Sequence, residues 1–200
     1  MQYKSSPATD ALSRHPAPPL VAALIEANRL KTLFRQGWLR AGVDPAHCES
    51  VADHSFGVAI LSLFLADAHF PALDRTKILL LALLHDFGEI YAGDIVPGKM
   101  SLADKHDLER AAVERVFAKL PNGAEYIALW QEYEDQSSPE AVLVKQVDRL
   151  EMGVQAVAYE NTLAPIDLSD FLQSTRDALS APPLLDFFSG LLPLRPGAPG

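Results

Sequence analysis

Features of exported and membrane-spanning proteins are scarce in this sequence. Cys48 is its single cysteine, so no intrachain disulfide can form, and this favours a reducing compartment. The N-terminal segment lacks the apolar stretch of a signal peptide. The longest strongly apolar run, residues 78–84, is far too short to cross a bilayer. We therefore expect a cytoplasmic protein with no membrane partner.

Basic side chains are also in short supply. The chain has 17 Lys and Arg residues against 26 Asp and Glu residues, which gives a net charge of -9. A nucleic-acid polymer needs a dense cationic face that displaces its counterions, so this class of partner is not expected. A small anionic substrate remains compatible with the acidic chain, because a metal ion and a few basic side chains reverse the potential locally.

Glycine is sparse, with 11 residues, whereas hydrophobic residues make up 48% of the chain. A length of 200 residues suits one well-buried core. Apolar positions recur at helical spacing and alternating strand patterns are rare, which predicts an all-α fold. We expect a single globular domain over residues 20–193, between a flexible N-terminal arm (1–19) and a flexible C-terminal tail (194–200).

Start and stop signals divide this domain into helices. Asp74 is a plausible N-cap, Ser101 and Asp104 resemble a capping box, and Ser138-Pro139 offers a cap followed by a first-turn proline. The predicted helices cover residues 20–36, 49–69, 74–88, 101–120, 124–134, 139–160, 168–179 and 183–192.

The run 78–84 is apolar on every face, which indicates a helix surrounded by protein, yet it leads directly into His85 and Asp86. Burying adjacent ionisable groups costs several kcal/mol for each uncompensated charge, and a bound cation supplies the compensation. On a continuous helix, Glu89 lies four residues after His85 and three after Asp86, and so shares their side. This pattern predicts a metal site with a free carboxylate beside it.

Two more helices place a metal-ligating side chain on an apolar face. His54 precedes the apolar positions Val58 and Leu61, and Asp148 lies four residues from both Val144 and Met152. Taken alone, a histidine on an apolar face is more often a hydrogen-bonded core residue than a ligand. Together with His85 and Asp86, however, the set offers two imidazoles and two carboxylates. It suits Mn²⁺, Fe²⁺, Co²⁺, Zn²⁺ or Mg²⁺.

The order His54, His85-Asp86, Asp148 reproduces the H…HD…D signature of HD-domain phosphohydrolases. The surrounding residues 49–54, 85–95, 129–134 and 144–148 make the chain similar to the 5′-deoxynucleotidase family, including its eukaryotic branch. The resemblance covers about residues 20–180. It implies a helical HD-domain bundle, a homodimer, and an octahedral divalent metal held by the four ligands.

That family hydrolyses deoxyribonucleoside 5′-monophosphates to a nucleoside and phosphate, by attack of a metal-bound water. By position, the resemblance implies catalytic roles for Glu89 and Asp94. We expect Asp94 to position or deprotonate the water and Glu89 to protonate the leaving 5′-oxygen, or the reverse. Without the resemblance, Glu89 would suit a surface position at a helix end and Asp94 a turn.

The family also uses an Arg-Trp pair to bind the deoxyribose. Trp38 matches the tryptophan, whereas Arg35 stands three residues before it, as in the eukaryotic branch, and Arg40 is a further candidate. Lys99 is the expected phosphate-binding cation, with Lys145 as an alternative, although either suits an ordinary solvated lysine. Trp38 alone would suit a packing role.

Two other functions fit the same signature. The metal site would also serve another phosphoester, such as an alarmone or a cyclic dinucleotide. A catalytically silent nucleotide-binding HD protein is the third possibility, and the intact set of ligands together with Glu89 and Asp94 argues against it.

Overall fold

Helices form the architecture of the computed structural model, which describes residues 2–6, 8–95, 98, 100–163 and 165–197. Within these residues, extended pairing is limited to two isolated antiparallel bridges, Tyr3 with Leu33 and Phe34 with Ser50. The predicted all-α class is therefore confirmed. The elements in chain order are α1 (Asp10–Arg14), α2 (Pro19–Ala27), the 3₁₀ helix η1 (Asn28–Lys31), α3 (Gln36–Arg40), α4 (Val51–His69), α5 (Arg75–Leu84), α6 (Glu89–Ala92), α7 (Leu102–Phe117), α8 (Gly123–Asp135), α9 (Pro139–Thr162), α10 (Ser169–Ala178), α11 (Pro182–Leu191) and the 3₁₀ helix η2 (Leu192–Leu194).

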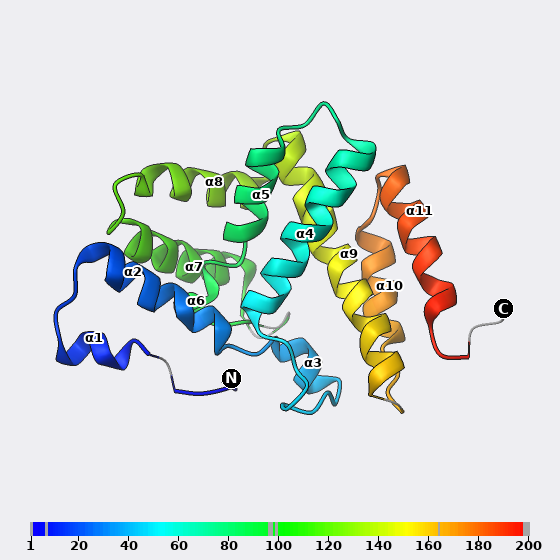
Figure 1. Ribbon diagram of the computed structural model, residues 1–200, viewed down its shortest axis with the longest axis horizontal. Helices are drawn as coiled ribbons and strands as arrows, with labels where there is room; N and C mark the ends of the chain where they lie inside the picture. Colours follow the sequence, from blue (N-terminus) through cyan, green and yellow to red (C-terminus); the bar gives the residue numbers. More distant parts are fainter. Residues whose placement is uncertain (1, 7, 96–97, 99, 164, 198–200) are drawn as a thin grey trace.

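Helices α4, α5 and α9 form the centre of the molecule, with α10 and α11 beside α9 and with α7 and α8 on the other side (Figure 1). Helix α4 is long and apolar enough to span a membrane by length and composition alone, a test that a core helix also passes. In this structure α4 packs against α5 and α9, and Val58 and Ala66 on α4 are buried. It is therefore a core helix of the bundle.

Two hydrophobic clusters fill the interior, and the predicted ligands lie where these clusters meet. Along α4, Val51 belongs to the cluster under α7 and α8, whereas Val58 belongs to the larger cluster around α9. His54 lies between them. Along α5, Leu81 belongs to the larger cluster and Leu84 packs against the other, immediately before His85. The packing thus brings two imidazoles to one interior position.

The helix predicted over residues 20–36 is broken after Lys31, so that prediction is wrong in its second half. The backbone from Leu33 to Arg35 pairs instead with the segment before α4. Arg35 N donates to Glu49 O at 3.2 Å, and Val51 N donates to Leu33 O at 2.9 Å. A continued helix would use these groups internally, so the two pairings are mutually exclusive.

The helix predicted over residues 74–88 ends at Leu84, and Glu89 begins a separate helix. Short turns replace the helical ladder, since Phe87 N donates to Leu84 O at 3.0 Å and Glu89 N donates to Asp86 O at 3.0 Å. His85 Nδ1 lies 2.7 Å from Ala82 O, the acceptor that residue 86 would use in a continued helix. The prediction that Glu89 shares a continuous helix with His85 is therefore wrong. Glu89 reaches the site through this turn.

The three predicted N-caps are confirmed, whereas the second bond of the capping box expected at Ser101 is not among the described contacts. Asp74 accepts hydrogen bonds from Thr76 N and Lys77 N, and Ser101 accepts one from Asp104 N. Ser138 begins α9, the helix that carries Asp148, and accepts from Ala141 N at 3.2 Å.

Replacing Ser138 by alanine is expected to lower the free energy of unfolding by about 1 kcal/mol, because a helix-start amide loses its acceptor. Urea denaturation measures the change, which should shift the midpoint without altering the slope. Ser137→Ala is the matched control, because Ser137 is exposed and does not cap α9. Equal midpoints for the two variants would refute the capping role.

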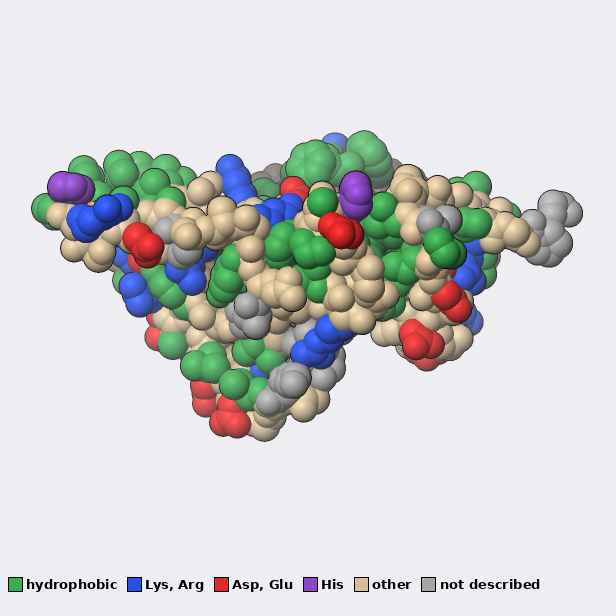
Figure 2. Space-filling model, turned by 90° about the horizontal axis from the view of Figure 1, so that it is seen from below, with side chains coloured by type: hydrophobic (Ala, Val, Ile, Leu, Met, Phe, Trp, Pro, Cys, Tyr) green, Lys and Arg blue, Asp and Glu red, His purple; other side chains and the backbone are tan. Residues whose placement is uncertain are grey.

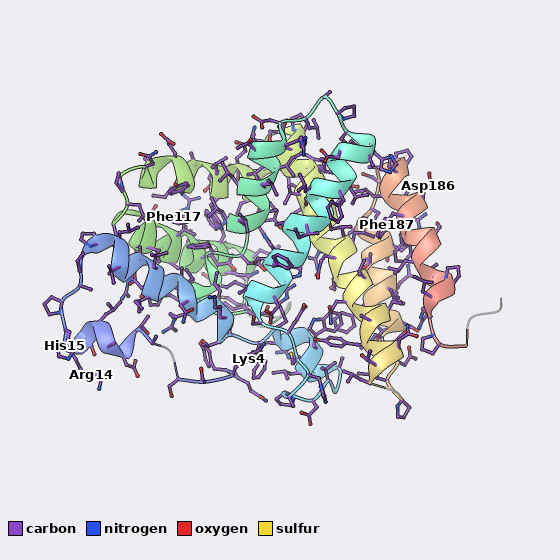
Figure 3. All side chains as sticks on the ribbon, viewed as in Figure 1. Lys4, Arg14, His15, Phe117, Asp186 and Phe187 are labelled. Atoms are coloured by element: carbon purple, nitrogen blue, oxygen red, sulfur yellow. The ribbon has the colours of Figure 1, made fainter. Side chains whose placement is uncertain are left out.

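The N-terminal arm contacts the body of the protein. Lys4 N donates to Thr32 O at 2.7 Å, and Lys4 Nζ lies 3.1 Å from Asp53 Oδ2 near the start of α4 (Figure 3). At the other end, Arg195 pairs with Glu160 at 2.7 Å. The flexibility of residues 1–19 and 194–200 stays a prediction, and residues 198–200 lie outside the described part of the chain.

Candidate metal centre

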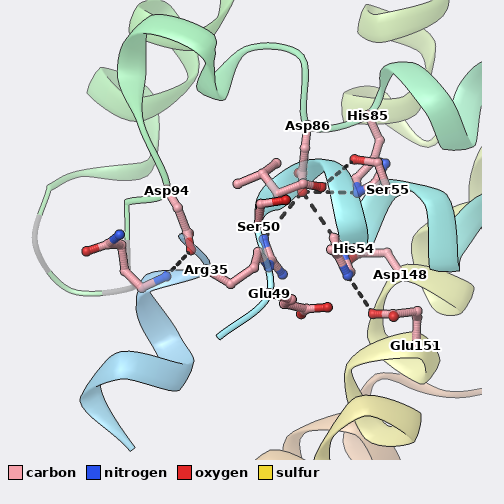
Figure 4. A network of polar contacts seen from close by, with 12 residues as sticks. Arg35, Glu49, Ser50, His54, Ser55, His85, Asp86, Asp94, Asp148 and Glu151 are labelled. Atoms are coloured by element: carbon pink, nitrogen blue, oxygen red, sulfur yellow. Dashed lines mark hydrogen bonds and ion pairs between the residues drawn. The ribbon is translucent and has the colours of Figure 1, made fainter. Parts of the chain in front are cut away.

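His54 is fully buried on α4, and both of its ring nitrogens face carboxylates (Figure 4). Nε2 lies 3.0 Å from Asp148 Oδ1 and 3.8 Å from Asp86 Oδ2. On the other edge of the ring, Nδ1 lies 2.5 Å from Glu151 Oε2. Asp148 and Glu151 both come from α9, so one helix contacts both nitrogens of this imidazole.

His85 presents its ring in a matching way. Its Nδ1 contacts the Ala82 carbonyl, which can only accept, so Nδ1 carries the proton and a neutral ring keeps its lone pair on Nε2. Nε2 lies 3.2 Å from Asp86 Oδ2 but makes no hydrogen bond of accepted geometry with the described residues. A buried imidazole nitrogen with an unused lone pair beside a carboxylate is the arrangement that a metal ion satisfies.

The residues present fit a divalent metal. Ligand atoms of His54, His85 and Asp86 all lie within 4.8 Å of one another, and Asp148 joins them through its 3.0 Å contact with His54 Nε2. Two imidazole nitrogens with carboxylate oxygens suit Mn²⁺, Fe²⁺, Co²⁺, Zn²⁺ or Mg²⁺. All four predicted ligands thus come together, although they start on three separate segments of the chain.

The electrostatics of the centre favour ionised carboxylates. Burial raises the pKa of Asp86, but its interactions with His85, Arg35 and His54 outweigh burial and hold the pKa well below its usual range. Burial also raises the pKa of Asp148, but the hydrogen bond with His54 outweighs it. The pKa of Asp148 therefore lies well below its usual range as well. Burial and the Arg35 charge oppose protonation of His54, yet its contacts with Asp148 and Glu151 raise its pKa to about 10. A proton on Nε2 of His54 therefore competes with a metal ion for this nitrogen.

Glu89 and Asp94, the predicted proton-transfer pair, lie beside the centre. Glu89 is 3% exposed, and its Oε2 has no hydrogen-bond partner among the described residues. Burial, followed by the charges of Asp86 and Asp94, raises the pKa of Glu89 well above its usual range. Asp94 Oδ2 accepts from Gln36 N at 2.6 Å, which fixes this carboxylate at the start of α3.

The predicted substrate-binding residues separate into different environments. Arg35 Nη1 lies 3.3 Å from Asp86 Oδ2, so Arg35 belongs to the centre. Trp38 is only 2% exposed, stacks on Phe171 with ring centroids 4.3 Å apart, and donates through Nε1 to Glu49 Oε1 at 2.7 Å. Lys99 lies outside the described residues.

Among the remaining candidates, Lys145 Nζ lies 4.2 Å from the centroid of the Tyr133 ring and 3.9 Å from Glu134 Oε1. Arg40 is exposed near the end of α3. Lys145 is thus engaged by neighbouring side chains, whereas the described contacts give Arg40 no place in the centre.

Three residues of the site were missed from the sequence. Glu151 contacts His54, Tyr133 donates to Asp148 Oδ2 at 3.0 Å, and Glu49 accepts from Trp38. Burial, followed by the charge of Glu151, raises the pKa of Glu49 to about 7. The available signal was spacing, because Glu151 follows Asp148 by three residues and therefore shares its face of α9.

Lys and Arg side chains lie apart from one another on the face shown in Figure 2 and do not form a continuous basic surface there. At the centre itself, Arg35 contributes a positive charge and is largely buried, with 17% of its side chain exposed. This arrangement suits a small anionic ligand better than an extended polyanion.

A family model described as an HD domain matches residues 27–182. The 5′-deoxynucleotidase HDDC2 of Homo sapiens is 35% identical over 191 residues, covering 94% of this chain and 91% of that protein. A solved structure from Pyrococcus horikoshii has a TM-score of 0.74 at 33% identity and covers 88% of this chain and 99% of its own. Another, titled a predicted metal-dependent phosphohydrolase from Magnetospirillum magnetotacticum, has a TM-score of 0.66 at 29% identity and covers 87% and 92%. The chain belongs to the HD-domain family and groups with its 5′-deoxynucleotidases.

Proposed function

We propose that this protein is a metal-dependent 5′-deoxynucleotidase that converts deoxyribonucleoside 5′-monophosphates into a nucleoside and phosphate. One observation carries the proposal: His54, His85, Asp86 and Asp148 converge on one interior position, with Glu89 beside it, whose Oε2 has no hydrogen-bond partner among the described residues. The names of the HDDC2 relatives support the same substrate class.

A divalent metal held by these four side chains would supply Lewis acidity toward the phosphoryl oxygens and toward water. The candidate ions are Mn²⁺, Co²⁺, Fe²⁺, Mg²⁺ and Zn²⁺. The chain contributes two ionised carboxylates and two imidazoles whose Nε2 atoms face them, so the ligands need little rearrangement.

Proton transfer falls to Glu89 and Asp94. The raised pKa of Glu89 favours its protonated form, which suits the donor to the leaving 5′-oxygen. Asp94, held by the Gln36 amide, is the acceptor for a proton of the attacking water. One proton is taken from water and one is given to the leaving alkoxide, so the products are an alcohol and inorganic phosphate.

Arg35 is the cation that we assign to the substrate, because its guanidinium lies at the centre and can pair with phosphate or sugar oxygens. Trp38 was expected to contact the deoxyribose. Its ring is buried against Phe171 and its indole N–H donates to Glu49, so these contacts support a packing role for Trp38. Lys99 remains a candidate for the phosphate.

Two further proposals are that the protein is a homodimer, which rests on the family resemblance, and that it resides in the cytoplasm, which rests on the composition of the chain with its single cysteine. Sedimentation of the purified full chain tests the first, and a monomer at micromolar concentration would refute it. Fractionation of the cells that naturally make the protein tests the cytoplasmic location, and recovery in the membrane fraction would refute it.

The deciding experiment is phosphate release from deoxyribo- and ribonucleoside 5′-monophosphates. Protein stripped of metal is reloaded separately with Mn²⁺, Co²⁺, Mg²⁺ and Zn²⁺, beside an Asp86→Ala control. We expect metal-dependent release that favours deoxynucleotides and is absent from the control. If the loaded protein binds metal and releases no phosphate from any monophosphate, the assignment fails, and alarmones and cyclic dinucleotides become the substrates to test.

A further inference from the structure

Glu151 makes the shortest described contact to any of the four predicted ligands. Its Oε2 lies 2.5 Å from His54 Nδ1, and the side chain is almost fully buried. Asp148, one turn earlier on α9, contacts the opposite nitrogen at 3.0 Å. Helix α9 therefore approaches one imidazole with a predicted metal ligand at Nε2 and a second carboxylate at Nδ1.

Gly57 makes room for this second carboxylate. It lies three residues after His54 on α4, and a Cβ built there would overlap Glu151 Oε1 and lie 3.0 Å from Glu151 Cδ. Glycine within a helix is less favourable than alanine by about 1 kcal/mol, so its presence here needs a compensating reason. The close approach of the Glu151 carboxylate supplies that reason.

We propose that Glu151, admitted by Gly57, is a positioning residue for the metal ligand His54. By accepting a hydrogen bond from Nδ1–H, its carboxylate keeps the proton on Nδ1, orients the ring and makes the Nε2 lone pair a stronger ligand for the cation. Glu151 acts through His54 and does not itself bind the metal. The inference rests on the metal site of the proposed function and adds the residue that sets its affinity.

Three variants separate the components of this arrangement. Glu151→Gln keeps an acceptor for Nδ1 and removes the charge, whereas Glu151→Ala removes both. Gly57→Ala changes no polar group and pushes the carboxylate away from His54. Because the added methyl meets side-chain atoms of Glu151 and no backbone atom, we expect this variant to fold even if Glu151→Ala does not.

The measurement is Co²⁺ titration of the metal-stripped full chain, followed by absorption spectroscopy and calorimetry without any nucleotide. We expect Gly57→Ala and Glu151→Gln to weaken Co²⁺ binding by about 10- to 100-fold while the stoichiometry is preserved. In proton NMR, the far-downfield Nδ1–H signal of His54 should move or broaden in both variants.

Two matched controls change the same residue types away from the centre. Glu160→Gln alters a buried carboxylate of α9 that pairs with Arg195, and Gly153→Ala adds a methyl 3.0 Å from Thr175 Cγ2. Both should leave Co²⁺ affinity within about twofold, even if they lower thermal stability.

Unchanged Co²⁺ affinity in both Gly57→Ala and Glu151→Gln would overturn the proposal. Complete loss of the bound ion in Glu151→Gln, as expected for Asp148→Ala, would overturn it as well, because Glu151 would then be a ligand. Since no substrate is used, a failure of nucleotide cleavage leaves this result readable.

Discussion

Replacing Glu89 by glutamine is expected to lower kcat by roughly 10²- to 10⁴-fold, the usual contribution of a positioned proton donor. The amide keeps the size of the side chain and cannot release a proton to the leaving 5′-oxygen. Metal affinity should change little, because Glu89 is not among the four ligands. Phosphate release by the metal-loaded protein, measured beside Co²⁺ titration, tests both statements.

The pH profile gives a second readout for Glu89. Burial and the charges of Asp86 and Asp94 raise the pKa of Glu89 and so extend the pH range in which it can donate a proton; kcat should therefore fall as pH rises through that pKa. The residual activity of Glu89→Gln should lack this alkaline limb. Glu140→Gln is the matched control, since Glu140 is a buried carboxylate paired with Lys77 away from the centre. Retention of full kcat by Glu89→Gln would remove Glu89 from the chemistry.

Asp148→Ala is expected to abolish both metal binding and phosphate release. The substitution deletes a predicted ligand and also removes the acceptor of Tyr133 OH and the partner of His54 Nε2. Each buried polar group left without a partner costs about 1–3 kcal/mol, so the metal-free protein should also lose stability. Metal analysis, phosphate release and urea denaturation measure the three effects.

Asp148→Asn separates these effects, because its amide oxygen still accepts from Tyr133 while the ligand charge is gone. We expect Asp148→Asn to lose metal binding and activity. Its urea midpoint should lie closer to that of the unsubstituted protein than the midpoint of Asp148→Ala does. Asp186→Asn, an exposed position on α11, serves as the control (Figure 3). Normal metal content in Asp148→Ala would refute its assignment as a ligand.

Local signals predicted the fold where they are strong, and non-local pairing overrode them elsewhere. Ser101 and Ser138 cap their own helices, so a short window of sequence contains the whole interaction. The break after Lys31 depends on a pairing between Phe34 and Ser50, which no local periodicity reveals. At the end of α5, the His85 ring contacts the carbonyl of Ala82, and the sequence alone does not predict this side-chain contact.

The same distinction applies to the site. His85 and Asp86 could be predicted because charged groups at the end of an apolar helix need compensation. Glu151 was missed because glutamate on a helix is usually solvated, and its partner His54 is 97 residues away. For Trp38, packing was the alternative to sugar binding, and its partner Phe171 could not be predicted because it lies on a helix far away in the sequence.

The two backbone bonds between the Leu33–Arg35 strand-like segment and the start of α4 have a consequence for protein engineering. These bonds join the two ends of the loop that contains the turn at residues 44–47, and the residues of this turn are exposed. Lengthening a closed loop is inexpensive, at about 0.6 kcal/mol for each doubling. This turn is therefore a suitable insertion point for an affinity tag or a fluorophore, because the bonds below it keep Arg35 and Glu49 in register.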